Sequence, residues 1–116
     1  MPLKVYILDD EPDICQVFKE NFSTSDIGIQ TFVDPKTLLE AIRTSPPDLI
    51  FLDYRLPNTT GDEVAKSIKI LIPMALLTGD FEVNAITNFE KKFHKQPFPW
   101  DEIENYLRDH LEKKIA

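Results

Sequence analysis

The sequence is poor in cysteine and in long apolar runs. Cys15 is the only cysteine among 116 residues, which excludes an intrachain disulfide and a cysteine-based zinc site. No apolar run approaches the roughly 20 residues that cross a bilayer. Residues 1–4 lead directly into a strand-like segment, without the pattern of a signal peptide. These features predict a cytoplasmic protein that does not insert into a membrane.

Positive charge is also scarce. Thirteen Lys and Arg residues stand against 20 Asp and Glu residues, giving a formal net charge of -7. Such a surface argues against direct nucleic-acid binding, which depends on clustered basic side chains, and favours a protein partner with a basic patch or a bound cation. A hydrophobic content of 42% is ordinary for a globular protein. The length predicts one domain over residues 1–116, without an output domain.

Short apolar runs alternate with amphipathic stretches along the whole chain. Strands are expected at residues 3–8, 27–33, 48–52, 74–77 and 93–95. Helices are expected from Pro12, from Pro35, over residues 61–70 and 82–90, and at the C-terminus, where Ile103, Leu107 and Leu111 recur at helical spacing. Repeated strand–helix units predict a doubly wound α/β fold, with a five-stranded parallel sheet and five helices.

Polar residues stand where the predicted strands end. Asp9 and Asp10 follow the first strand, Asp53 the third, Thr78 the fourth, and Lys95 ends the fifth. In such a sheet, sites form beyond the carboxyl ends of the strands. The sequence therefore predicts a site at this edge.

Three aspartates placed close together repel one another unless a proton or a cation relieves the repulsion. Mg²⁺, or Mn²⁺ in its place, suits such oxygen ligands. A carboxylate can attack phosphorus to form an acyl phosphate. A nearby ammonium and the Thr78 hydroxyl could then interact with the transferred oxygens. These residues are compatible with phosphoryl transfer to a carboxylate of this group.

Three motifs resemble the landmarks of bacterial two-component response-regulator receiver domains, of the single-domain, chemotaxis-regulator-like kind. The motifs are Ile7-Leu8-Asp9-Asp10-Glu11, the block from Asp53-Tyr54-Arg55-Leu56-Pro57 to Gly61, and Leu76-Leu77-Thr78-Gly79. They occur in the family's order over nearly the whole chain. The resemblance implies a flavodoxin-like fold with strand order 2-1-3-4-5.

By this resemblance Asp53 is the phosphoacceptor. Asp10, Asp53 and the Arg55 backbone carbonyl would hold the metal ion, with Asp9 assisting. Thr78 would be the switch hydroxyl. The family also implies a histidine kinase or histidine phosphotransfer protein as phosphodonor, and a downstream protein target.

Two further positions follow from the resemblance. Arg55 and Asp80 correspond to residues that flank the pocket and tune the lifetime of the acyl phosphate. Their opposite charges suggest that they pair across the mouth of the pocket.

The region before Pro97 departs from the family pattern, in which a lysine directly precedes a cis proline. One alignment places Gln96 at the lysine position and Phe93 at the switch aromatic. The other keeps Lys95 as the phosphoryl-binding lysine and puts Lys92 at the aromatic position. We favour Lys95 because its flexible stem can reach an oxyanion from a neighbouring position. Whether the Gln96–Pro97 bond is cis stays open.

The predicted function is a phosphorylation-switched signalling domain that assists its own phosphorylation but is not a dedicated enzyme. The alternative is a degenerate receiver that docks a partner without phosphorylation, suggested by the altered sequence before Pro97. A phosphohydrolase is disfavoured, because Tyr54-Arg55 provides no second acid two residues after Asp53.

Overall fold

The computed structural model describes residues 2–79 and 89–116. The strands are β1 (Leu3–Leu8), β2 (Ile27–Phe32), β3 (Leu49–Asp53), β4 (Arg55–Leu56), β5 (Thr59–Thr60), β6 (Met74–Thr78) and β7 (Lys91–His94). The helices are α1 (Pro12–Phe22), α2 (Pro35–Thr44), α3 (Gly61–Ser67) and α4 (Trp100–Ile115). None of these helices is long and apolar enough to cross a membrane.

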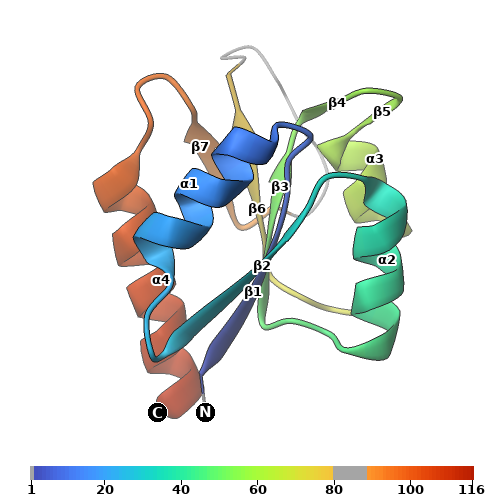
Figure 1. The fold of residues 1–116 in the computed structure, drawn as a ribbon. Helices are drawn as coiled ribbons and strands as arrows, with labels where there is room; N and C mark the ends of the chain where they lie inside the picture. The colour runs from blue at the N-terminus through green and yellow to red at the C-terminus, as the bar shows by residue number, and fades with distance from the viewer. Residues whose placement is uncertain (1, 80–88) are drawn as a thin grey trace.

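Five parallel strands form the main sheet in the order β2-β1-β3-β6-β7. Helices α1 and α4 lie on one face of the sheet, and α2 and α3 lie on the other (Figure 1). This arrangement confirms the predicted doubly wound, flavodoxin-like fold, whose strand order 2-1-3-4-5 counts only the strands of the main sheet. The described residues contain four helices, and the predicted helix at 82–90 falls almost entirely on residues 80–88, outside them.

The central strands are buried along their length, as expected for parallel strands covered on both faces. Every residue of β3 and β6 is buried. The face under α1 and α4 is rich in aromatic side chains, including Phe18, Phe51 and Phe93. The face under α2 and α3 is mainly aliphatic. The two cores hold the sheet between the helix pairs.

Local signals in the sequence account for the helix starts. The Asp34 side chain accepts a hydrogen bond from the Thr37 backbone N–H at 3.1 Å, and Pro35 occupies the first turn of α2. The Thr60 hydroxyl caps α3 in the same way by accepting from the Glu63 N–H at 3.2 Å. Both caps fix where a helix leaves the carboxyl edge of the sheet.

The structure differs from the predicted elements in three details. Helix α3 ends at Ser67 rather than residue 70, because residues 68–73 must return the chain to the start of β6. Strand β7 spans Lys91–His94 rather than 93–95, since its register is set by pairing with β6. The short antiparallel pair β4–β5 was not predicted, because two-residue strands carry no periodicity.

The amino edge of the sheet is closed by polar contacts. Asp48 Oδ2 accepts hydrogen bonds from the Lys4 backbone N–H at 2.8 Å and from Lys114 Nζ at 2.7 Å. The Ser45 carbonyl accepts from Lys4 Nζ at 3.1 Å and from the Tyr6 hydroxyl at 2.5 Å. These contacts tie β1, the end of α2 and the C-terminal helix together.

Candidate functional site

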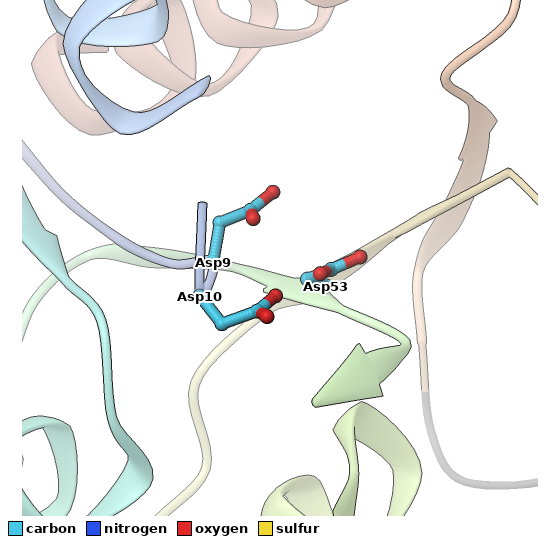
Figure 2. A group of neighbouring side chains, drawn as sticks. All are labelled: Asp9, Asp10 and Asp53. Carbon is cyan, nitrogen blue, oxygen red and sulfur yellow. The ribbon is translucent and has the colours of Figure 1, made fainter. Parts of the chain in front are cut away.

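The acidic residues predicted from the sequence lie together at the carboxyl edge of the main sheet. Asp9, Asp10 and Asp53 each offer one carboxylate oxygen, and these oxygens lie within 4.8 Å of one another. Figure 2 shows the Asp10 carboxylate directed toward Asp53, while Asp9 lies beside them at the end of β1. The parallel register of β1 and β3 brings these strand ends to one place.

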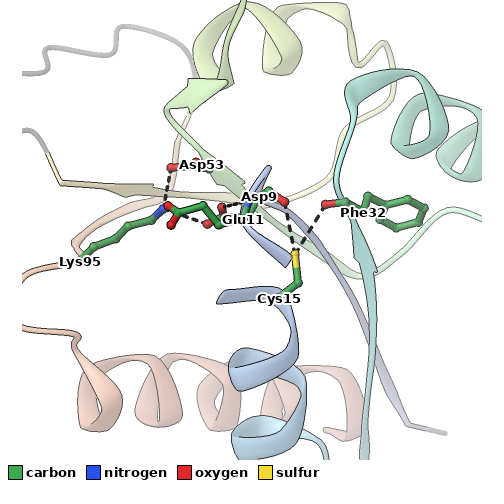
Figure 3. A network of polar contacts seen from close by, with 6 residues as sticks. All are labelled: Asp9, Glu11, Cys15, Phe32, Asp53 and Lys95. Carbon is green, nitrogen blue, oxygen red and sulfur yellow. Dashed lines mark hydrogen bonds and ion pairs between the residues drawn. The ribbon is translucent and has the colours of Figure 1, made fainter. Parts of the chain in front are cut away.

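Asp9 is fully buried, and both of its oxygens accept hydrogen bonds (Figure 3). Oδ1 accepts from the Glu11 backbone N–H at 2.9 Å, and Oδ2 accepts from Lys95 Nζ at 2.8 Å. A buried carboxylate held in this way has one orientation. Asp9 is therefore the fixed member of the acidic group.

Lys95 joins two of the aspartates. Its Nζ lies 2.8 Å from Asp9 Oδ2 and 2.9 Å from Asp53 Oδ1, and the side chain is 13% exposed. Burial alone would lower the pKa of this ammonium, but the hydrogen bonds to Asp9 and Asp53 outweigh it and the pKa is raised. The ammonium stays charged beside the carboxylates.

The neighbouring residue behaves differently. Gln96 is exposed, and the peptide bond between Gln96 and Pro97 is cis. The structure therefore brings Lys95, and not Gln96, to the acidic residues, with Gln96 as an additional residue before the cis proline. The role of Lys95 in phosphoryl binding stays a prediction.

Asp53 is 5% exposed, and its surroundings disfavour the charged form of its carboxyl group. Burial raises its pKa, the hydrogen bond from Lys95 opposes this, and the charges of Asp9 and Asp10 raise it further, to about 7. One lysine does not balance three carboxylates. An additional cation would relieve the imbalance.

Gly61 allows the chain to pass close behind Asp53. A Cβ atom on Gly61 would lie 2.4 Å from the Asp53 carbonyl oxygen, where real Cβ atoms do not occur. The Gly61 N–H donates to the Tyr54 carbonyl at 2.7 Å, and the Tyr54 N–H donates to the Leu77 carbonyl at 2.9 Å. This backbone network fixes Asp53 against β6 and the start of α3. The close approach explains why the second motif ends in a glycine, because any side chain at this position would collide with the Asp53 carbonyl.

The other predicted site residues have varied surroundings. Thr78 is 1% exposed, and its carbonyl accepts from the Lys95 N–H at 2.9 Å. Phe93 is 1% exposed and stacks on Phe51 with ring centroids 6.0 Å apart, inside the core under α1 and α4. Arg55 is exposed at the start of β4. Its predicted pairing with Asp80 cannot be placed, because Asp80 lies outside the described residues.

Two contacts at Asp9 were missed by sequence reasoning. The hydrogen bond from the Glu11 N–H to Asp9 Oδ1 is an Asx turn, which aspartate commonly forms with the backbone N–H two residues later. Cys15 Sγ donates to the Asp9 carbonyl at 3.3 Å, and the Cys15 side chain is buried. Burial raises the pKa of this thiol to about 11, and the Asp9 charge adds to the effect. Cys15 therefore packs as an inert thiol.

The donor set fits a hard divalent cation. Three carboxylates face one ammonium, and oxygen ligands of this kind suit Mg²⁺ or Mn²⁺. Asp10 and Asp53 have the carboxylates best placed to hold it, because both Asp9 oxygens already accept hydrogen bonds. The three carboxylates among the predicted metal ligands are thus chemically suitable, and the part of the Arg55 carbonyl stays a prediction.

Comparison with known proteins points to one family. The family model of the response regulator receiver domain matches residues 5–96. The sporulation initiation phosphotransferase F of Bacillus subtilis is 30% identical, and the match covers 96% of this chain and 95% of that protein. The alkaline phosphatase synthesis transcriptional regulatory protein PhoP of the same organism is 33% identical over 78% of this chain. The match covers 39% of PhoP, so the chain corresponds to less than half of that relative.

Solved structures share the fold. The receiver domain of the Francisella response regulator 1452 has a TM-score of 0.83 at 23% identity, covering 97% of this chain and 98% of that one. The response regulator TrrA of Thermotoga maritima, in complex with Mg²⁺ and BeF, has a TM-score of 0.81 at 24% identity. That match covers 93% of this chain and 98% of the other. In both comparisons the structural similarity covers almost the whole chain.

Proposed function

Because the chain belongs to the response-regulator receiver domain family, we propose that Asp53 accepts a phosphoryl group from a histidine of a kinase or phosphotransfer protein, with Mg²⁺ bound. The reaction places an acyl phosphate on Asp53. The span 1–116 acts as one receiver domain in the cytoplasm, and it signals to a downstream protein by surface contacts.

The proposed transfer exchanges one bond to phosphorus for another. A carboxylate oxygen of Asp53 bonds to the phosphorus as the phosphorus–nitrogen bond of the donor phosphohistidine breaks, and the released imidazole keeps the electron pair and takes up a proton. Asp10, Asp53 and the Arg55 carbonyl would hold Mg²⁺, with Asp9 assisting, and the bound ion would supply positive charge to the transferred oxygens. Thr78 contributes its hydroxyl as a hydrogen-bond donor and acts as the switch residue.

The observation that carries the proposal is the position of Lys95. Its Nζ contacts Asp53 Oδ1 at 2.9 Å and Asp9 Oδ2 at 2.8 Å. An ammonium has three hydrogen-bond donors, so a third remains for a phosphoryl oxygen on Asp53. A fixed cation beside the nucleophile is what stabilises the charge of the transferred group. This contact also weakens the case for a degenerate receiver, since that case began from the altered Lys95-Gln96-Pro97 sequence.

Intact-mass measurement after incubation with acetyl phosphate tests the proposal. We expect a single phosphoryl adduct on the wild type with Mg²⁺, and none with a chelator. Asp53→Asn should give no adduct under either condition. Lys36→Glu, an exposed change on α2, is the matched control and should label like the wild type.

An adduct that forms on Asp53→Asn, or that forms equally without a divalent ion, would contradict the proposed site. A folded wild type that is never labelled would favour the docking module instead. Mg²⁺ titration of unfolding provides a separate readout of the metal site. At ten times the dissociation constant, Mg²⁺ should stabilise the wild type by about 1.4 kcal/mol.

A further inference from the structure

A hollow of about 410 Å³ opens between the C-terminal ends of α2 and α3. Both helices begin near the carboxyl edge of the sheet and run away from it on the same face (Figure 1). The hollow therefore lies away from the acidic residues. Its lining includes Leu39, Ile42, Ile68 and Ile70, together with the two basic residues Arg43 and Lys69.

The charge of this hollow is opposite to that of the whole protein. The chain has a formal net charge of -7, yet no carboxylate is among the residues that line the hollow. Among the ion pairs of residues 2–79 and 89–116, none involves Arg43 or Lys69. Arg43 and Lys69, beside the aliphatic side chains of the hollow, would complement a partner that carries carboxylates next to apolar side chains.

The segment after α3 extends the apolar surface. Ile70 is 45% exposed and Leu71 is completely exposed, with a relative area of 104%. Ile68, Lys69 and Ile70 also line a second hollow of about 900 Å³ on the other side of this segment. Consecutive exposed aliphatic residues between two hollows form a ridge that a partner could cover.

We propose that this surface, the α2–α3 groove, binds a short acidic amphipathic helix of a partner protein. Leucine-like side chains on one face of that helix enter the aliphatic hollow and cover Ile70. Carboxylates on its flanks pair with Arg43 and Lys69. Helix-in-groove binding of this kind uses apolar anchors one helical turn apart, which matches a hollow between two helix ends.

The chemistry disfavours other occupants. A nucleic acid or an anionic membrane surface requires a broad basic area, whereas here two cations stand on a strongly acidic protein. The groove lies away from Asp53, so its occupation does not depend on phosphoryl chemistry at the acidic residues. The inference is thus independent of the proposed function.

The test uses a synthetic helical peptide with leucines one turn apart and glutamates beside them. ¹⁵N-labelled protein is titrated with the peptide without a phosphodonor, and affinity is measured by fluorescence anisotropy. We expect shifts confined to residues 39–46 and 67–72. The double variant Arg43→Glu, Lys69→Glu should bind at least about tenfold more weakly. It should bind better to a peptide in which lysines replace the glutamates.

The control variant is Lys19→Glu, Lys113→Glu, which makes the same charge change on exposed positions of α1 and α4 and should bind like the wild type. The amide spectrum of each variant verifies that it is folded. Three results of the titrations would overturn the proposal: shifts outside the groove, equal affinity for the two double variants, or equal affinity for a peptide with alanines in place of its leucines. Sedimentation that shows self-association through Ile70 and Leu71 would assign the groove to a second copy and also overturn it.

Discussion

Lysine and aspartate meet at both edges of the main sheet, in different proportions. At the carboxyl edge the carboxylates of Asp9, Asp10 and Asp53 lie together, and the Lys95 ammonium pairs with those of Asp9 and Asp53. At the amino edge one carboxylate, that of Asp48, accepts from Lys114 Nζ and from a backbone N–H. The same residue types thus produce an unbalanced cluster and a balanced one.

The pKa values follow this difference. Burial and the neighbouring aspartates raise the pKa of Asp53 to about 7 against the opposing hydrogen bond of Lys95. At Asp48 burial also acts to raise the pKa, but the hydrogen bonds from Lys114 and from the Lys4 N–H outweigh it and lower the pKa. Excess negative charge at the carboxyl edge favours binding of a cation. At the amino edge the carboxylate is already paired, and it stabilises the fold.

The largest expected difference between the two edges is the loss of stability when the paired lysine at each edge is replaced. Lys95→Met leaves buried carboxylates without their ammonium and should destabilise the protein by about 3 kcal/mol. Lys114→Met breaks an ion pair whose side chains are 29% and 34% exposed, and should cost at most about 1 kcal/mol. Urea unfolding of both variants at neutral pH, without divalent ions, measures the difference.

Equal losses of stability in the two variants would mean that the buried carboxylates at the carboxyl edge do not depend on the Lys95 ammonium for their stability. Mg²⁺ provides a second comparison, because a divalent cation can replace part of the missing charge. Added Mg²⁺ should restore stability to Lys95→Met and leave Lys114→Met changed no more than the wild type.

Backbone packing also differs between the edges. Gly61 lies against the Asp53 carbonyl, so Gly61→Ala forces a backbone shift and should destabilise the protein by about 2 kcal/mol. In an unconstrained helix the same change would stabilise, because alanine is the better helix former. Gly28, paired with Lys4 in β2, is the control, because a Cβ atom on it would have no neighbouring atom within 4 Å.

Gly28→Ala should change the free energy of unfolding by no more than about 0.5 kcal/mol. Thermal and urea unfolding of the two glycine variants give the comparison. Phosphoryl labelling of Gly61→Ala should also slow, since the Asp53 backbone moves. A Gly61→Ala protein that is more stable than the wild type would show that the close approach at Asp53 is not maintained in solution.

The carboxyl edge was the more predictable of the two regions. Parallel strands that alternate with helices must end at one edge, so Asp9, Asp10 and Asp53 could be placed together from their positions after apolar runs. The buried strands were equally clear, because β3 and β6 are apolar up to the polar residue that ends each of them, Asp53 and Thr78. Topology thus carried most of the prediction.

What the sequence could not predict depends on contacts between distant segments. The reach of Lys95 to Asp53 depends on how β7 pairs with β6, and either alignment before Pro97 was compatible with the residues. The early end of α3 follows from the path back to the sheet, not from helix propensity. The Lys114–Asp48 contact joins residues 66 positions apart, which no local pattern reports.

The smallest expected effect is a pH dependence at the amino edge. The folded state holds the pKa of Asp48 below 3.8, its ordinary value, so this carboxylate stabilises the fold above that pH and loses its contribution as pH falls through the folded-state pKa. The free energy of unfolding of the wild type should therefore exceed that of Asp48→Asn by about 1 kcal/mol near neutral pH, and the difference should disappear in acid. Urea unfolding of both proteins from neutral pH into the acid range measures this difference in the free energy of unfolding.

Salt should reduce the difference, because the Lys114–Asp48 pair is partly exposed and is screened by ions. A difference that grows toward acid would mean that Asp48 is held protonated in the fold, as its burial alone would favour, and the contrast between the two edges would then be lost.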